Sequence, residues 1–363
     1  MKKKLYISLA AGVVLSALGF YFAFRNVPFD ALAASMAGIN YLWLIPGAAI
    51  GLFSFAVRAL RWQVILGSTL KLSFFSAFHP LMIAFMINSV LPGRIGELAR
   101  PAIIKKQDNV PFSLGMTTIA AERILDAITL IVLFAWVLAT VHIDPGLQTE
   151  FRGYRLNLEK LENIASAMVR VCIAVAAAVI VVSIPAVQRF LKRVIIKAPS
   201  LFFSENSPIG AGVLEKCCLP LTRIIDHIAA GLSMVKQPMS LLLCVAYSAL
   251  IWLLQAAALY VAALGFPSIA LDFSEMTAVF IIICFFIMLP SVPGYWGLWE
   301  AGAVFGAALF GVSSEAAAGF GLLSHAMMIF PVIGVGVVSA FVTGVSILGI
   351  SYETRNESLP IDR

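Results

Sequence analysis

Three charged side chains follow a break in an apolar stretch, and their spacing could hold a phosphate group. Arg94, Glu97 and Arg100 are three residues apart, so they share one face of a helix that begins at the break. An arginine guanidinium can bind phosphate through two hydrogen bonds, and a helix N-terminus adds free N–H groups and a positive dipole end. Ionisable groups at membrane depth are unfavourable unless they are paired, so by default they mark function.

Two further clusters place ionisable side chains in apolar surroundings. Glu122, Arg123 and Asp126 open a long apolar stretch, while Glu300 and His325 lie in the C-terminal part of the chain. A head-group site is therefore predicted from Arg94, Glu97, Arg100, Glu122, Arg123, Asp126 and Glu300. The candidates for carrying a coupled proton are Glu122, Asp126 and His325.

Each of these clusters also has a structural interpretation. Glu122, Arg123 and Asp126 could be a salt-bridge cluster that holds helices together, and His325 could be a core histidine with satisfied hydrogen bonds. The remaining membrane-interface candidates are two arginines near the cytoplasmic end of a span, which can snorkel to lipid phosphates, and two tryptophans, which can stack on a sugar or anchor at the interface. They are Arg58, Arg61, Trp296 and Trp299.

The charged residues are positioned by two similar breaks, which begin 201 positions apart at Pro92 and Pro293. Unsatisfied backbone in hydrocarbon is stable only where protein or a wet cavity surrounds it, and paired breaks are a pointer to a transporter's binding site. Glycines at the breaks would let the backbone approach a ligand closely. The break residues are Pro92, Gly93, Gly96, Pro293, Gly294 and Gly297.

Composition predicts an all-α polytopic membrane protein, with residues 1–363 as one transmembrane domain. The chain is 61% hydrophobic and 12% charged, against about 25% charged in soluble domains. Shorter apolar pieces at 74–91 and 277–290 end at the breaks, and 94–107 and 297–311 could return as half-helices, which gives two re-entrant hairpins. Six full spans are expected at 5–24, 42–66, 113–141, 167–185, 239–265 and 317–348.

The distribution of Lys and Arg predicts that both termini are cytoplasmic, because cytoplasmic loops are rich in these residues. Under this topology, units 42–141 and 239–348 form an inverted repeat. The offset of 201 also pairs Phe85 with Phe286. Two open alternatives are a coincidence between two Pro-Gly-x-x-Gly strings and a layout of eight helices, two of them broken. The first apolar run, after Lys2-Lys3-Lys4, is interpreted as an uncleaved span.

The polar connection at 186–238 is predicted to be a cytoplasmic connector. Its segment Leu221 to Val235 has apolar residues on one side, which is typical of a helix lying on the lipid surface. Basic neighbours would favour anionic lipid. A connector packed on the bundle is the alternative.

Several function classes lack their sequence signals. The five cysteines form no CxxC pair and no metal-ligand spacing, and no GxxxxGK[ST] motif is present, so no metal site, cofactor or direct nucleotide hydrolysis is predicted. The net charge of +6 could suggest nucleic acid, but its distribution over the loops does not.

Three strings resemble the lysylphosphatidylglycerol synthase transmembrane-domain family, also described as flippase-like integral membrane proteins. They are LPGRIGELARPAIIKK, TTIAAERILDAI and LPSVPGYWGLWEAGAV, and the resemblance covers nearly the whole chain. It implies translocation of lipid: aminoacylated phospholipid in two-domain members, and other phospholipids, polyprenyl-linked glycans or hopanoid-related lipids in stand-alone members. The chain ends at Arg363 without an aminoacyl-transferase domain, so synthesis of lysyl-lipid is not expected.

Together these features predict a non-enzymatic lipid flippase or scramblase in a bacterial or archaeal inner membrane. Its partners would be anionic or glycosylated phospholipids, not nucleic acid, and a homo-oligomer stays an open alternative. Two other functions also stay open. One is a membrane-embedded glycosyl or phosphoryl transferase that acts on a polyprenyl-phosphate, and the other is an ion-coupled transporter of small solutes.

Overall fold

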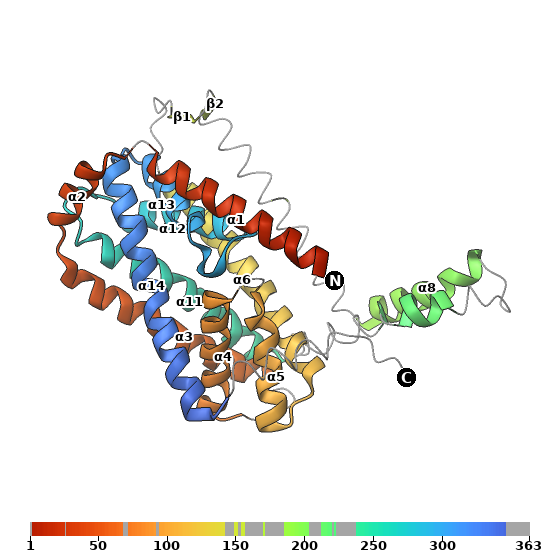
Figure 1. Cartoon of the computed structure of the whole chain (residues 1–363). Helices are drawn as coiled ribbons and strands as arrows, with labels where there is room; N and C mark the ends of the chain where they lie inside the picture. The colour runs from red at the N-terminus through yellow and green to blue at the C-terminus, as the bar shows by residue number, and fades with distance from the viewer. Residues whose placement is uncertain are drawn as a thin grey trace.

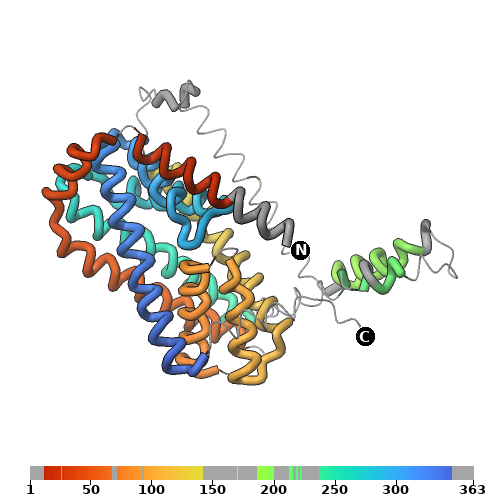
Figure 2. Tube along the Cα trace, viewed as in Figure 1, coloured from red at the N-terminus to blue at the C-terminus, as the bar shows by residue number. Residues whose placement is uncertain are grey.

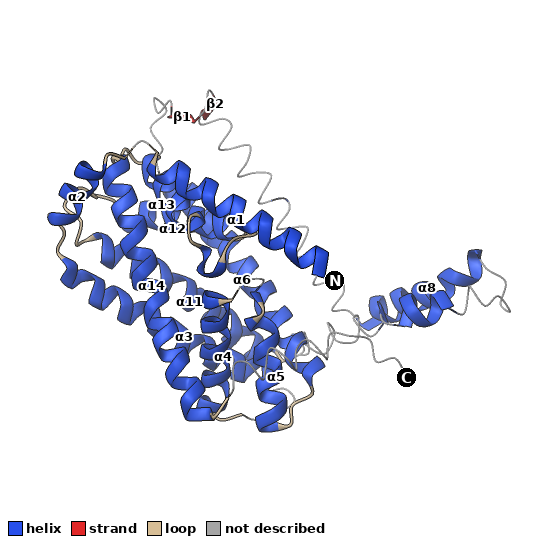
Figure 3. Cartoon of the chain, in the orientation of Figure 1, coloured by secondary structure: helices blue, strands red, loops and turns tan. Residues whose placement is uncertain are grey.

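The computed structural model describes residues 2–25, 27–67, 72–91, 94–141, 149–151, 154–156, 170, 185–202, 212–219, 221–222 and 237–345. These residues form a bundle of helices with one short antiparallel hairpin, β1 (Thr149–Phe151) and β2 (Tyr154–Leu156) (Figure 1, Figure 3). The prediction of a helical membrane protein is confirmed.

Among the described residues, four helical segments are long and apolar enough to cross a membrane. They are Tyr41–Leu66, which joins η1 (Tyr41–Trp43) to α3 (Leu44–Leu66), α6 (Phe112–Thr140), α11 (Pro238–Ala263) and α14 (Ser314–Thr343). They coincide with four of the six predicted spans. Nearly all residues of the predicted span 167–185 and of the predicted interfacial helix 221–235 lie outside the described residues.

The first predicted span is not followed directly by a loop. α1 (Lys2–Phe24) is joined to a second helix, α2 (Phe29–Ala37), and the two are bent by 76° between Gly12–Phe24 and Phe29–Ala37. Pro28 precedes α2 with extended backbone, as expected for a proline at a helix start. The pair counts as a fifth candidate span if it crosses the membrane as one unit.

α3 and α11 form an antiparallel pair at the centre of the bundle. At one end the Asn40 N–H donates to the Gly265 carbonyl at 2.9 Å, and at the other Arg61 donates to Ser248 at 2.8 Å. Gly47 permits the close approach, because a Cβ there would lie 3.0 Å from the Ala258 carbonyl oxygen. The helices that follow α3 and α11 therefore begin at opposite ends of the bundle.

Those following helices are the two predicted short pairs, α4 (Phe74–Val90) with α5 (Gly96–Asp108), and α12 (Phe273–Ile287) with α13 (Leu298–Ala308). None has the roughly 20 residues that a span needs. Figure 1 shows α12 and α13 beside α1, while α4 and α5 lie near the far end of α14. In the tube of Figure 2 the chain turns back between the two helices of each pair.

The tips of the two pairs meet. A Cβ on Gly294 would lie 3.1 Å from the Ser89 carbonyl oxygen, and Arg94 donates to the Ile287 carbonyl at 2.9 Å. Arg94 and Tyr295 both have left-handed backbone, with φ of 54° and 62°. The residues that follow them differ, because Ile95 is helical whereas Trp296 is extended, with ψ of 136°. Pro92 and Gly93 lie outside the described residues.

The connector contains α8 (Pro185–Phe202), which packs against the short π-helix η3 (Leu214–Cys218). Four basic residues of α8 fall on one side of the helix, and Phe190 and Val194 on the other side are exposed. α8 is thus an amphipathic helix of the connector, while the helix expected at 221–235 lies almost wholly outside the described residues and stays a prediction.

Candidate functional site

Five charged side chains from three helices are buried together, and we call them the buried ion network. Each is at most 8% exposed, which makes their mutual pairing necessary, since an unpaired charge in this environment is strongly unfavourable. α3 supplies two of them, α5 one and α6 two. They are Arg58, Arg61, Arg100, Glu122 and Asp126.

One half of the buried ion network joins α5 to α6. The guanidinium of Arg100 donates to both carboxylate oxygens of Glu122, at 2.5 Å and 3.1 Å. The same guanidinium lies 3.5 Å from the centre of the Trp62 ring, and the Trp62 indole N–H donates to Thr118 at 2.9 Å. Arg100 is therefore fixed from two directions.

The other half joins α3, α6 and α11. Arg61 donates to Asp126 at 2.7 Å and to the Ser248 hydroxyl at 2.8 Å, and the Trp252 indole donates to the same Asp126 oxygen at 3.2 Å. The second oxygen of Asp126 has no hydrogen bond and lies 3.6 Å from both Arg58 and Arg123. Asp126 is thus the point where most cations of the site converge.

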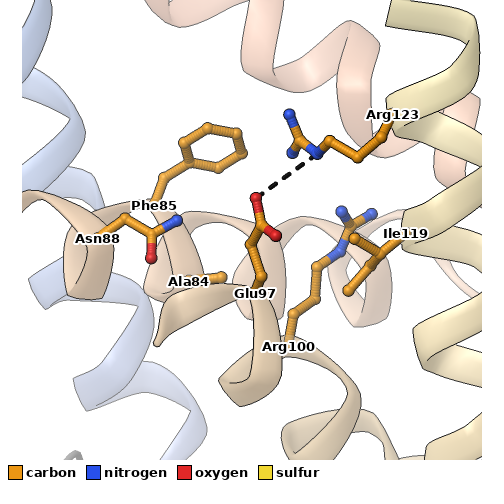
Figure 4. A pocket seen from close by; sticks show the side chains of 7 residues that line it. All are labelled: Ala84, Phe85, Asn88, Glu97, Arg100, Ile119 and Arg123. Carbon is orange, nitrogen blue, oxygen red and sulfur yellow. Dashed lines mark ion pairs between the residues drawn. The ribbon is translucent and has the colours of Figure 1, made fainter. Parts of the chain in front are cut away.

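A small pocket opens next to the buried ion network (Figure 4). Beside it, Arg123 and Glu97 form a pair 3.6 Å apart with side chains 46% and 33% exposed; we call them the pocket pair. The pocket has room for about one water molecule, so a lipid head group would fit only after α5 and α6 move apart. Its lining residues are Ala84, Phe85, Asn88, Glu97, Arg100, Ile119 and Arg123.

Gly96 and Asn88 position the pocket pair. The Gly96 N–H donates to the Asn88 side-chain oxygen at 2.8 Å, which caps the start of α5. A Cβ on Gly96 would lie 1.9 Å from the Ala84 carbonyl oxygen, so only glycine allows α5 to begin this close to α4. Glu97 is then the next residue of the helix and faces Arg123 on α6.

Arg94 points away from the pocket pair toward the second tip. Besides its hydrogen bond to Ile287, its guanidinium lies 5.6 Å from the centre of the Tyr295 ring. The side chain is exposed, and it donates a hydrogen bond to a backbone carbonyl at the end of α12, where the helix dipole is negative. Arg94 therefore bridges the two tips.

Glu300 and His325 form a separate group, which we call the second-break pair. Glu300 is fully buried, accepts the Gly297 N–H at 2.7 Å and lies 2.7 Å from Nδ1 of His325. The other ring nitrogen of His325 lies 2.7 Å from the Gly294 carbonyl oxygen. The rings of Trp296 and Trp299 flank His325, with centroids 4.3 Å and 5.0 Å away.

The structure places the site residues predicted from the sequence in three different groups. The structure brings Glu97, Arg100, Glu122, Arg123 and Asp126 together, as expected, but places Arg94 at the tips and Glu300 with His325 at the second break. Sequence reasoning missed the polar partners that complete these sites. Because these contacts depend on how the helices pack, only polar residues and tryptophans in apolar spans could have signalled them: Asn88, Ser248, Trp62 and Trp252.

The predicted interface residues differ most from expectation. Arg58 and Arg61 are 8% and 1% exposed and face Asp126, so they do not extend outward in the manner of snorkelling arginines. Both arginines face inward because the buried carboxylate of Asp126, on the neighbouring helix α6, needs cationic partners. Trp299 is buried against His325 and Ser324, and Trp296 is half-buried against His325, instead of both reaching outward.

Among the described residues, no group of three His, Cys, Asp or Glu side chains is arranged to hold a metal ion. The arrangement can instead hold an anion or a polar head group. Within the site, four arginines (the three of the buried ion network and Arg123) face three carboxylates (Glu97, Glu122 and Asp126), which leaves one net positive charge next to the pocket.

Comparison with known proteins is consistent with this geometry. Residues 9–336 match the family described as the lysylphosphatidylglycerol synthase TM region. The chain is also 25% identical over 346 residues to a Haloferax volcanii protein named glycosyltransferase AglD, which covers 88% of this chain and 52% of the relative. The chain thus spans about half the length of this curated relative. No solved structure matches the chain.

Proposed function

Because the chain belongs to the lysylphosphatidylglycerol synthase transmembrane-region family, we propose that it moves the head group of a phosphate-containing lipid across the membrane. The lipid would be an anionic or glycosylated phospholipid, or a polyprenyl-linked glycolipid, and the acyl or prenyl chains would stay in the bilayer. Crossing about 30 Å of hydrocarbon is prohibitive for a phosphate without a polar path.

The observation that carries this proposal is the position of the pocket pair. Glu97 and Arg123 are partly exposed, are 3.6 Å apart and lie against a buried ion network with a net positive charge. An ion pair with this separation between its charged atoms and with side chains this exposed contributes little to the free energy of unfolding. Its charges are therefore free to exchange partners, with Arg123 binding phosphate and Glu97 or Asn88 binding a hydroxyl or amine of the head group.

Within this proposal the buried ion network supports the site rather than carrying the lipid. Arg58, Arg61, Arg100, Glu122 and Asp126 hold α3, α5, α6 and α11 in register and leave the positive surplus at the pocket. Arg94 would be the first cation met by a phosphate between the tips, and Trp296 would lie at the edge of that path.

We further propose an inverted repeat of units 42–141 and 239–348, with the polar path between the two short helix pairs. Its best support is that residues related by the offset of 201 touch each other: Gln255 donates to Ser54, and Arg94 lies against Tyr295. Such contacts are expected where a two-fold axis in the membrane plane passes between the repeats. The small pocket then corresponds to a closed state.

The proposed setting is the cytoplasmic membrane of a bacterium or archaeon, with six spans and with both termini in the cytoplasm. The connector at 186–238 would then rest on the inner leaflet. Its basic helix α8, with exposed Phe190 and Val194, supports that placement.

A second candidate function is glycosyl transfer to a polyprenyl-phosphate, favoured by the Haloferax volcanii relative, which is named a glycosyltransferase. The same pocket could hold the lipid phosphate in either case. The relative, however, is about twice the length of the matched region, so its named activity does not have to reside in the part that resembles this chain.

Reconstituted liposomes distinguish these functions. We expect the wild type to move fluorescent phospholipid head groups between leaflets, and Arg94→Ala and Glu97→Gln to slow this by about tenfold or more, the loss expected for one hydrogen bond to a charged group. Arg25→Ala, which changes an exposed arginine outside the site, should match the wild type. Equal rates in all four proteins would contradict the proposed site. Sugar transfer from a nucleotide-sugar to added polyprenyl-phosphate would favour the enzyme.

A further inference from the structure

The two contacts of His325 in the second-break pair need one more hydrogen than a glutamate carboxylate and a neutral histidine carry between them. A carbonyl oxygen only accepts hydrogen bonds, so the ring nitrogen of His325 that faces Gly294 must carry a hydrogen. The other ring nitrogen faces the Glu300 carboxyl oxygen at 2.7 Å, and a hydrogen must lie between those two atoms as well. Glutamate with neutral histidine has only one hydrogen for these two contacts.

We infer that Glu300 and His325 share one removable proton that holds the second break against α14. With the proton present, the pair has no net charge, either as carboxylate with imidazolium or as carboxylic acid with imidazole. When the proton leaves for water, the pair carries one negative charge and one of the two contacts becomes lone pair against lone pair. Both changes are unfavourable in a buried site.

Loss of the proton acts on the backbone of the second break. Gly294 is held to α14 by His325, and Gly297 is held by Glu300, so these two hydrogen bonds fix both ends of the turn. Gly294 also packs on the side chain of Ile329, which a Cβ would approach to 2.7 Å. Once the pair is deprotonated, the turn loses a polar contact to α14 and is free to move away from the first tip.

The surroundings leave this proton to the second-break pair alone. The flanking rings of Trp296 and Trp299 have no titratable group, and their faces favour a cationic imidazolium. No ion pair or hydrogen bond joins the pair to another titratable side chain among the described residues. The titratable groups with described side chains on the elements packed around it are Glu315 on α14, Glu275 and Cys284 on α12, Tyr295 at the break, Tyr21 on α1, Asp30 on α2, Arg58 and Arg61 on α3, His79 on α4, and Cys244, Tyr247 and Tyr260 on α11.

The two other proton candidates are less suited to this role. Glu122 and Asp126 face three arginines of the buried ion network, which already has one net positive charge, so a proton on either would raise that charge and leave a further buried cation without its partner. The second-break pair instead passes between a neutral and an anionic form. Coupling of this step to lipid movement rests on the proposed function, whereas the release of the turn does not.

The release of the turn can be measured without lipid transport. We would follow hydrogen exchange of peptides covering residues 292–300 in the full chain in nanodiscs, from about pH 5 to about pH 10, after correction for intrinsic exchange rates. The range extends beyond the pH 5 to pH 8 in which histidines ordinarily change charge, because loss of the proton is unfavourable in a buried site. In the wild type, protection of this segment should fall by about tenfold as pH rises, the effect of losing a buried hydrogen bond. A protection that does not change with pH in the wild type overturns the inference.

Glu300→Gln tests the shared proton itself. The amide can still accept from Gly297 and donate to His325, so the turn stays held but no removable proton remains. We expect protection in this variant to be independent of pH, whereas Glu315→Gln, on α14 with His325 but outside the pair, should behave as the wild type. A pH response of equal size in Glu300→Gln also overturns the inference.

Lipid movement under an imposed pH difference separates this inference from the proposed function. We expect the wild type to respond to the pH difference and Glu300→Gln to lose that response. If wild-type exchange depends on pH but no protein moves lipid, the second-break pair acts as inferred and the proposed function is wrong. If lipid moves in the wild type and in Glu300→Gln with the same response to the pH difference, the coupling is wrong.

Discussion

The two breaks share a left-handed residue at equivalent positions but differ in their chemistry. Arg94 and Tyr295 occupy equivalent left-handed positions, yet the first break is followed by the partly exposed Glu97, and the second by the fully buried Glu300. Glu97 has an arginine partner at 3.6 Å, while Glu300 has a histidine partner at 2.7 Å. We therefore propose that the first half binds the head group and that the second half undergoes the conformational change.

The same division is seen in what surrounds each break. The first half places a net positive charge behind its pocket, which attracts phosphate. The second half places aromatic rings around a neutral pair, which repels water and favours one proton. Substitutions in the two halves should therefore fail in different ways, and the following experiments use that contrast.

Glu122→Gln should have the largest effect on stability. It leaves Arg100 buried without its carboxylate, which destabilises proteins by about 3–5 kcal/mol. Thermal unfolding in detergent should show the loss. The double variant Arg100→Leu with Glu122→Leu should recover much of it, because no unpaired charge remains. If Glu122→Gln unfolds at the wild-type temperature, the buried ion network is not what holds the first half together.

Gly96→Ala should be next, and it affects only the first break. The added Cβ would lie 1.9 Å from a backbone oxygen of α4, so α5 must shift, with a destabilisation of about 1–3 kcal/mol. Gly334→Ala is the matched control, since nothing lies within 4 Å of a Cβ at that helical position. It should leave stability unchanged or raise it by about 0.4–1 kcal/mol. Equal unfolding temperatures for the two variants would contradict the close packing of α4 and α5.

These two predictions depend on contacts that the sequence could reveal only in part. The helices on either side of each break were predictable because Pro-Gly pairs and apolar runs are local signals, and the segments 94–107 and 297–311 match α5 and α13 closely. The partner of Arg61 is 187 residues away at Ser248, and that of His325 includes a backbone carbonyl. Contacts of this kind depend on how helices pack, which no local pattern encodes.

Charge balance gave a partial signal for the site. Three arginines and two carboxylates at membrane depth cannot all be solvated, so their mutual pairing follows from energetics. The sequence could not show that Arg58 and Arg61 turn inward, because snorkelling satisfies an arginine equally well. The two arginines face inward instead of snorkelling because α3 packs along its whole length against α11, which buries their side chains.

Acid should destabilise the start of α12, which opens the second short pair, but not the start of α4, which opens the first short pair. Asp272 caps α12, and hydrogen bonds from the Ser274 hydroxyl and the Glu275 N–H lower the pKa of its carboxyl. A lowered pKa means that the cap stabilises the fold above the unfolded-state pKa and that this contribution is lost as pH falls through the folded value. α4 is capped by the Ser73 hydroxyl, which does not titrate.

Hydrogen exchange at the two helix starts would test this contrast. Peptides at the start of α12 should lose protection on acidification, while those at the start of α4 should not. Asp272→Ala should remove the difference and destabilise α12 by about 1 kcal/mol. A loss of protection that is equal at both helix starts would point to general acid unfolding instead of the cap.

Arg123→Gln should have the smallest effect on stability and so gives the sharpest test of the comparison. The pocket pair is long and partly exposed, so its loss should change the free energy of unfolding by about 0–1 kcal/mol. Head-group movement should nevertheless fall by about tenfold, because a guanidinium that binds phosphate is lost. A large fall in unfolding temperature would instead place Arg123 with the buried ion network, through its approach to Asp126 at 3.6 Å, as a structural residue. A stable protein with unchanged lipid movement would remove the pocket pair from the path, and the first half would then differ from the second in packing alone.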